Sequence, residues 1–132
     1  MCFIIHEDHK EPKIADEDIT CYKRFHHFLK EDGDFASINE GNLTGFLSFI
    51  YCAIYNFEEK YGPIELGISI DKKEIDKGFH SYNYEGFERY YDSYKYFIKC
   101  FIPEGSKYYY NPQHGEYVSD SIVIGGLKDV KI

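Results

Sequence analysis

The stretch GFHSYNYEGF, residues 78–87, combines residue types that suit a small anionic ligand. His80 can donate or accept a hydrogen bond, Ser81 can bond an oxygen atom, and Tyr82 can stack on a flat ring. If a helix begins just after them, the unpaired N–H groups at its start favour an anion such as a phosphate. We therefore predict a nucleotide-like binding corner here. The structural alternative is that Gly78 makes a turn, His80 is a partnered buried imidazole and the tyrosines belong to the core.

Two histidine pairs are further candidate sites. The segment HEDH places His6 and His9 three residues apart with carboxylates between them, a spacing that suits a metal ion on a helix. No second cluster with ligand spacing completes such a site in the sequence, so we predict no metal. His26 and His27 follow a predicted strand, where neighbouring side chains point to opposite faces, and we predict a structural or exposed role for them.

Short motifs of the common enzyme classes are missing from the sequence. It contains no G-x-S-x-G, no Walker A loop, no G-x-G-x-x-G and no H-E-x-x-H. The four cysteines have no C-x-x-C spacing and follow no secretory signal, which is typical of reduced thiols. The apolar start MCFII is too short for a signal sequence or a membrane span. We expect a soluble cytoplasmic protein that makes no membrane contact.

Charge and composition narrow the partners. Fifteen Lys and Arg stand against 23 Asp and Glu, a formal net charge of −8, and residues 1–40 hold ten acidic and five basic side chains. Direct nucleic-acid binding is not expected, because no basic patch is large enough to neutralise phosphates. Ten of the 14 tyrosines lie between Tyr82 and Tyr117. An acidic surface rich in tyrosine is typical of protein recognition, so a host or viral protein is one predicted partner.

The elements that position these residues fit one small domain of 132 residues. Residues 1–18 are predicted to form a polar N-terminal lead-in, and residues 19–132 a single folded domain. Alternating apolar, β-branched and aromatic residues predict strands at 19–25, 65–70, 96–103, 116–124 and 128–132. The segment 43–57 keeps helical spacing yet is apolar on its other face too, so it stays open between helix and strand.

A helix is predicted over residues 83–94. Asn83 is a suitable N-cap, and Phe87, Tyr90, Tyr91 and Tyr94 follow at i, i+3, i+4 and i+7. Several strands around one clear helix predict an α+β domain with a mostly antiparallel sheet of undetermined order.

The order CYKRF, GFHSY before a helix, IKCFIPEGSKYYY and GEYVSDSIVI resembles small uncharacterised phage and prophage proteins. More remotely it is similar to the core of ADP-ribosyltransferase-like domains, over most of residues 19–132. The resemblance implies that Lys23 or Arg24 takes the place of the first-strand arginine, Ser81 that of the central serine motif and Glu116 that of the catalytic glutamate. It further implies NAD as the cofactor, with His80 at the adenosine ribose or a phosphate.

The sequence also departs from that family. HSY stands in place of Ser-Thr-Ser, CYKRF lacks a Tyr-Arg-Gly pattern, and His114 stands where an arginine-specific enzyme would carry an upstream glutamate. Function depends on the site more than on the fold. We therefore predict a non-catalytic binding or interaction protein, such as a phage-type accessory factor.

This predicted protein binds either a partner through its acidic, tyrosine-rich surface or a nucleotide-like small molecule. The predicted ligand-binding residues are Lys23, Arg24, His80, Ser81 and Tyr82, with no cofactor. The alternative is an NAD-dependent ADP-ribosyltransferase-like enzyme in which Glu116 is the catalytic carboxylate that stabilises the oxocarbenium-like charge.

Overall fold

The computed structural model describes residues 3–36, 41–48, 53–83 and 96–131 of the chain. These residues form an almost entirely antiparallel β-structure. Its helical pieces are two 3-10 turns, η1 (Glu7–His9) and η4 (Leu127–Asp129). The predicted α+β class is therefore wrong. The helix predicted over 83–94 falls, from residue 84 onward, outside the described residues.

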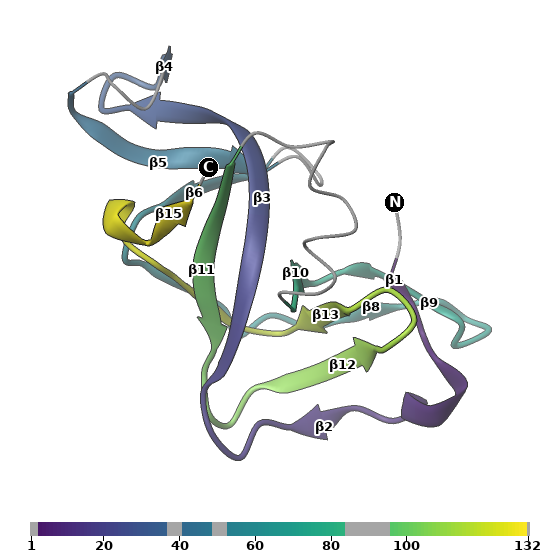
Figure 1. Cartoon of the computed structure of the whole chain (residues 1–132). Coiled ribbons are helices and arrows are strands. Elements are labelled where there is room, and N and C mark those ends of the chain that lie inside the picture. Colours follow the sequence, from purple (N-terminus) through teal and green to yellow (C-terminus); the bar gives the residue numbers. More distant parts are fainter. Residues whose placement is uncertain (1–2, 37–40, 49–52, 84–95, 132) are drawn as a thin grey trace.

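One large sheet dominates the described chain and curls into a half-barrel (Figure 1). Its main path is β2 (Lys13–Ile14), β12 (Lys107–Asn111), β13 (Glu116–Ser119), β10 (Phe79–Tyr82), β3 (Ile19–Lys30), β11 (Tyr96–Ile102), β14 (Ile122–Ile124) and β7 (Lys60–Tyr61). Off this path lie β4 (Phe35–Ala36), β5 (Leu43–Ser48), β6 (Ile54–Asn56) and β15 (Val130–Lys131). A small second sheet has the order β1 (Phe3–Ile4), β9 (Glu74–Lys77), β8 (Gly67–Ile68).

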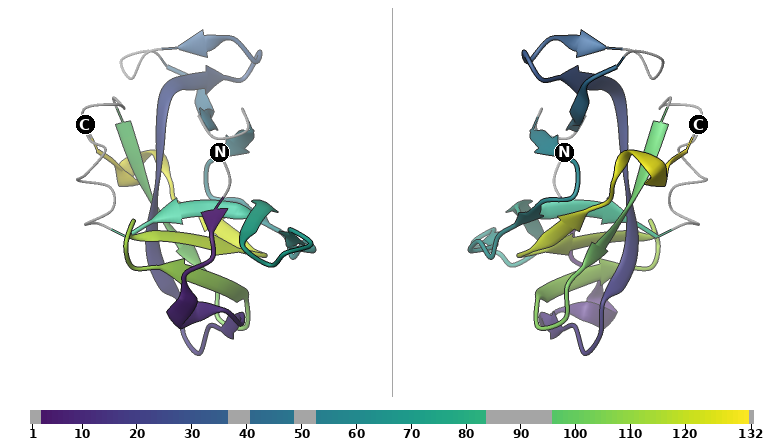
Figure 2. Two further views of the ribbon diagram at one scale, coloured as in Figure 1. Left: turned by 90° about the vertical axis from the view of Figure 1, so that its right-hand side faces the viewer. Right: turned by 90° about the vertical axis from the view of Figure 1, so that its left-hand side faces the viewer.

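Strand β3 lies in the middle of the large sheet and runs beside β11 along most of the height of the molecule (Figures 1 and 2). At Phe25 it pairs with Tyr96 of β11 on one edge and with Ser48 of β5 on the other. The register with β5 then shifts between Phe25 and His27. The extra residue is His26. Because a bulge reverses the alternation of side chains, Phe28 and not His27 lies on the same face as Phe25.

The segment left open between helix and strand is strand wherever it is described. Strands β5 and β6 pair in antiparallel fashion, with Gly45 opposite Asn56. A Cβ atom at Gly45 would lie 2.0 Å from the backbone oxygen of Tyr55, so the close approach of the two strands requires glycine at this position. The apolar residues on both faces of this segment are explained by sheet pairing, which local spacing does not reveal.

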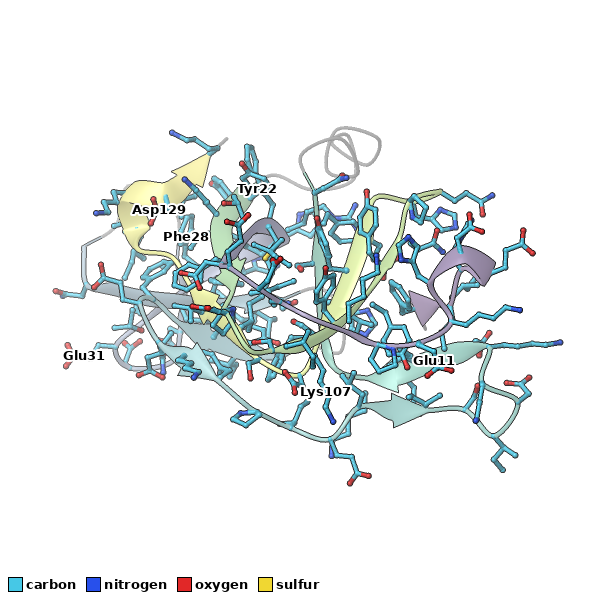
Figure 3. All side chains as sticks on the ribbon, turned by 90° about the horizontal axis from the view of Figure 1, so that it is seen from below. Glu11, Tyr22, Phe28, Glu31, Lys107 and Asp129 are labelled. Atoms are coloured by element: carbon cyan, nitrogen blue, oxygen red, sulfur yellow. The ribbon has the colours of Figure 1, made fainter. Side chains whose placement is uncertain are left out.

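Two buried clusters stabilise the fold. The larger one is rich in aromatic rings, and Phe25 stacks on Phe46 at 4.5 Å and on Tyr96 at 5.5 Å. The smaller one consists of Phe3, Ile75, Tyr109 and Val118. In Figure 3 the side chain of Phe28, a member of the larger cluster, lies within the body of the molecule, whereas exposed Glu31 lies at its edge.

Most predicted strands are confirmed, with changed bounds. Strand β3 continues from the predicted 19–25 to Lys30, and β11 ends one residue before the predicted Pro103. The predicted strand 116–124 is divided into β13 and β14. From the predicted lead-in, β1 pairs with β9 and β2 pairs with β12, so residues 1–18 contribute strands to both sheets.

Candidate functional site

Residues Phe79–Tyr82 form an inner strand, β10, and not the turn expected before a helix. His80 pairs with Val118 of β13, while Tyr82 pairs with Glu116 of β13 and also with Tyr22 of β3. Phe79 and Ser81 lie on one face of the sheet, and His80 and Tyr82 lie on the other. All four side chains are buried or half-buried, as is typical of a central strand.

This alternation divides the predicted site residues between the two faces of the sheet. Tyr22, Tyr82 and Glu116 are directly opposite one another in register, so their side chains share one face. Arg24 lies two residues after Tyr22 on that same face, called the Arg24 face below. Lys23 is on the opposite face, the Lys23 face, which belongs to the larger aromatic cluster. Ser81, between His80 and Tyr82, also points to the Lys23 face.

Lys23 is the most distinctive group on its face. Its side chain is buried, with 4% of the residue exposed, and its Nζ donates a hydrogen bond of 2.7 Å to the backbone oxygen of His80. The ammonium also lies 4.7 Å from the centre of the Tyr55 ring. Among the described residues, no carboxylate lies within ion-pair distance of this Nζ. A buried positive charge is thus held by one carbonyl and one aromatic ring.

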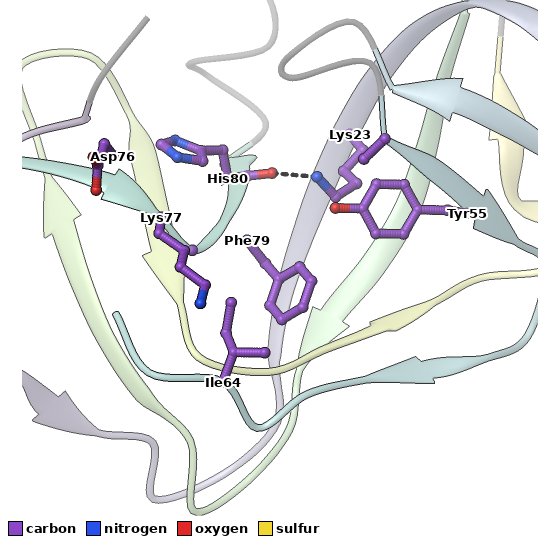
Figure 4. Close-up of a pocket in the computed structure, with 9 residues that line it drawn as sticks. Lys23, Tyr55, Ile64, Asp76, Lys77, Phe79 and His80 are labelled. Atoms are coloured by element: carbon purple, nitrogen blue, oxygen red, sulfur yellow. Dashed lines mark hydrogen bonds between the residues drawn. The ribbon is translucent and has the colours of Figure 1, made fainter. Parts of the chain in front are cut away.

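A pocket of about 270 Å³ opens beside Lys23 (Figure 4). Its walls are mostly apolar or aromatic, and the exposed Asp76 and Lys77 add one charge of each sign. The lining residues are Lys23, Ala53, Tyr55, Ile64, Asp76, Lys77, Gly78, Phe79 and His80. We call this cavity the Lys23 pocket. Pockets that combine apolar walls with a few polar groups are the usual binding sites for small molecules.

Ser81 does not line the pocket but is fully buried beside Cys21. Burial raises the pKa of the Cys21 thiol strongly, Cys100 raises it further, and the Ser81 hydroxyl opposes both effects. Cys21 and Cys100 are directly opposite each other on β3 and β11, and both are free thiols. The contacts of Ser81 therefore belong to the core.

On the Arg24 face, two contacts hold the remaining predicted residues. The guanidinium carbon of Arg24 lies 3.8 Å from the centre of the Tyr82 ring, within cation–π range. Nδ1 of His80 lies 3.2 Å from Oε1 of Glu116, with the histidine buried and the glutamate side chain 15% exposed. The ring of His80 thus faces Glu116, while its backbone oxygen holds Lys23 on the other side of the sheet.

Three residues that line the Lys23 pocket were not selected from the sequence. Tyr55 comes from β6, Ile64 from the loop after β7, and Phe79 from β10. Their aromatic or apolar character was visible, yet nothing in their spacing links positions so far apart in the chain. Of the tyrosines between Tyr82 and Tyr117, none that the structure describes is exposed.

The histidine pair near the N-terminus lies at the turn η1. His6 Nδ1 accepts a hydrogen bond from the backbone N–H of Asp8, and the ring of His9 packs edge-on against Tyr110 at 6.2 Å. Residues 3–36, 41–48, 53–83 and 96–131 contain no group of three or more potential metal ligands. Over the same ranges, no helix has both the length and the apolar character that crossing a membrane requires.

No family model, no curated protein and no solved structure matches this chain. The resemblance to phage proteins and to ADP-ribosyltransferase-like domains therefore stays a prediction.

Proposed function

We propose that this protein is a non-catalytic binding protein and that its ligand is a small molecule with an acidic group, bound in the Lys23 pocket. The buried ammonium of Lys23 carries the proposal. An ammonium has three N–H donors, and the His80 oxygen takes one of them. Burying a charge without an opposite charge is costly, and none of the described residues places a carboxylate within ion-pair distance of this ammonium. An acidic ligand would offset that cost at this wall of the pocket.

Binding without turnover is favoured by the position of Glu116. The carboxylate points to the Arg24 face, contacts His80, and does not line the Lys23 pocket. A catalytic group must reach its substrate within hydrogen-bonding distance or through one water. A ligand held by Lys23 is separated from Glu116 by the sheet itself.

The NAD expected from the family resemblance does not fit this pocket. A volume of about 270 Å³ lies just below the roughly 300–1,000 Å³ that is usual for small-molecule sites. A dinucleotide needs much more room. Of Lys23 and Arg24, either of which the resemblance puts in the place of the first-strand arginine, only Lys23 lines the pocket. We therefore derive no step that involves NAD.

We place this binding activity in the cytoplasm. Cys21 and Cys100 are free although they face each other on paired strands, which fits a reducing compartment.

The test compares ligand binding in the wild type and in Lys23→Met, with Lys99→Met as the matched control. Lys99 is an exposed lysine on the neighbouring strand β11. Thermal melting is measured with millimolar benzoate, inorganic phosphate, AMP and ADP-ribose. A ligand at 100 times its dissociation constant should stabilise the fold by about 2.7 kcal/mol. We expect at least one acid to raise the melting temperature of the wild type and of Lys99→Met, but not of Lys23→Met.

Two results would overturn the proposal. One is that none of these acids shifts the melting temperature of the wild type. The other is that the shift is the same in Lys23→Met, which would place the bound acid elsewhere on the protein.

A further inference from the structure

We infer that the ligand of the Lys23 pocket is an aromatic monocarboxylate: one ring that carries one carboxylate. This inference rests on the proposed binding function and specifies its ligand. Three properties of the pocket lead to it: its volume, its charges and its walls.

The volume accommodates a ligand of one ring and its substituent. A water molecule takes up about 30 Å³ in the liquid. A pocket of about 270 Å³ therefore holds roughly nine waters, which is close to the size of a benzene ring with a carboxylate.

The charges favour a ligand with a single negative charge. Among the lining residues that the structure describes, Lys23 and Lys77 are joined by Asp76, so their formal charges sum to +1. A carboxylate has two oxygens that can accept the two N–H donors which Lys23 does not give to His80. A phosphate monoester carries close to two negative charges at neutral pH. Against a described lining of net charge +1, a phosphate would leave an excess of negative charge in the site, whereas a carboxylate would not.

The walls favour a flat ring over a flexible chain. Tyr55 and Phe79 are 6.4 Å apart between ring centres and inclined by 64°, and Ile64 and Ala53 complete the apolar lining. Figure 4 shows Phe79 and Ile64 across the open space from the Lys23 ammonium. One face of Tyr55 is already covered by that ammonium, so the acid group binds at this end and the ring packs toward Phe79. Aromatic rings prefer such edge-to-face contacts.

Isothermal titration calorimetry with four related probes tests the inference. They are benzoate, its neutral analogue benzamide, its non-aromatic analogue cyclohexanecarboxylate, and phenyl phosphate. We expect benzoate to bind most tightly. Benzamide should bind at least tenfold more weakly, because it lacks the charge that Lys23 pairs with.

Two variants test the charge and the apolar wall of the site separately. Lys23→Met should weaken benzoate by roughly 10- to 150-fold, the range for a lost hydrogen bond to a charged group. Ala53→Leu adds bulk to the apolar wall of the pocket and leaves Lys23 in place, and it should weaken benzoate at least tenfold. Ala36→Leu, at a half-buried alanine on β4 outside the pocket, is the control and should bind as the wild type does.

The outcomes distinguish the inference from the proposal on which it rests. If phenyl phosphate or cyclohexanecarboxylate binds more tightly than benzoate and depends on Lys23, the ligand class is overturned while acid binding stands. Benzoate binding that Ala53→Leu leaves unchanged also overturns it. If none of the acids binds, the proposed function fails together with the inference.

Discussion

Lys23 and Arg24 are neighbours in the centre of β3, and both are buried, with 4% and 7% of the residue exposed. Their surroundings nevertheless differ. Lys23 points to the larger aromatic cluster, where it meets one carbonyl, one ring and a pocket. Arg24 points to the other face of the sheet, where its guanidinium carbon lies 3.8 Å from the centre of the Tyr82 ring.

The difference shows how a single strand can separate two roles. Adjacent residues of a strand point to opposite faces, so two basic side chains next to each other cannot serve one ligand. The guanidinium stacks on its ring and contributes to the fold. The ammonium is a compact point charge with three hydrogen-bond donors, which suits the binding of an anion.

The largest effect should come from the core that supports the Lys23 face. Phe25→Ala removes a ring that packs on Phe28, Phe46 and Tyr96, and it should lower the free energy of unfolding by about 3–5 kcal/mol. Phe97→Ala, on the Arg24 face, should cost less, because Phe97 belongs to neither buried cluster of the described residues. Urea unfolding measures both. An equal or larger loss for Phe97→Ala would contradict this ranking of the two faces.

The next effect separates the two basic residues themselves. Arg24→Met should lower the free energy of unfolding by about 1–2 kcal/mol, since it loses a desolvated cation–π contact with Tyr82. Lys23→Met should change it by less than about 1 kcal/mol, because replacing a buried charge by an apolar chain is often neutral. Urea unfolding without added ligand gives both values. A large loss for Lys23→Met would assign Lys23 to the fold and weaken the argument for a ligand.

A smaller effect is expected at the carboxylate of the Arg24 face. Glu116→Gln keeps the shape of the side chain but loses the charge that faces His80, and it should lower the free energy of unfolding by about 1 kcal/mol or less. Benzoate affinity should stay within about twofold of the wild type, because Glu116 lies across the sheet from the pocket. A strong loss of affinity, measured by calorimetry, would mean that the two faces act as one site.

The smallest expected effect is the labelling of the two thiols on the Lys23 face. Burial raises the pKa of Cys21 strongly and that of Cys100 to about 11, so both are poor nucleophiles. We expect almost no iodoacetamide labelling of either at pH 8 in the folded protein and full labelling in guanidinium, read by peptide mass spectrometry. Rapid labelling in the folded state would show that solvent reaches this face beyond the pocket.

The same shift predicts a loss of stability at high pH. An unfolded thiol loses its proton near pH 9, whereas folded Cys100 keeps it until about pH 11. The stabilising contribution is complete below pH 9 and falls as the pH rises toward 11. Cys100→Ala should make the pH dependence of urea unfolding shallower over this range.

Sequence analysis identified several strands and failed on the fold class. Residues 19–25 and 96–103 alternate and carry β-branched and aromatic side chains, which marks strands locally. The segment 43–57 could not be assigned, because its helical spacing is a by-product of apolar residues on both faces of a paired strand. Its pairing with β3 depends on residues more than ten positions away in the chain.

The candidate site was predicted only in part. His80 and Lys23 were selected for their chemistry, and the structure joins them through a backbone oxygen and not through the imidazole. Glu116 was selected from a family resemblance, and the structure places it beside the ring of His80. Tyr55, Ile64 and Phe79 were not selected at all, since an apolar wall has no sequence signature.

The sequence by itself determined which residues could bind an anion and the acidic, aromatic character of the chain. It also determined the two strands that form the β3–β11 pair. Only the tertiary structure decided the order of the strands in the sheet, the bulge at His26 and the division of neighbouring basic residues between two faces. The physical reason is that hydrogen bonds between strands join residues far apart in the chain. Which side chains then share a face depends on a register that no local pattern fixes.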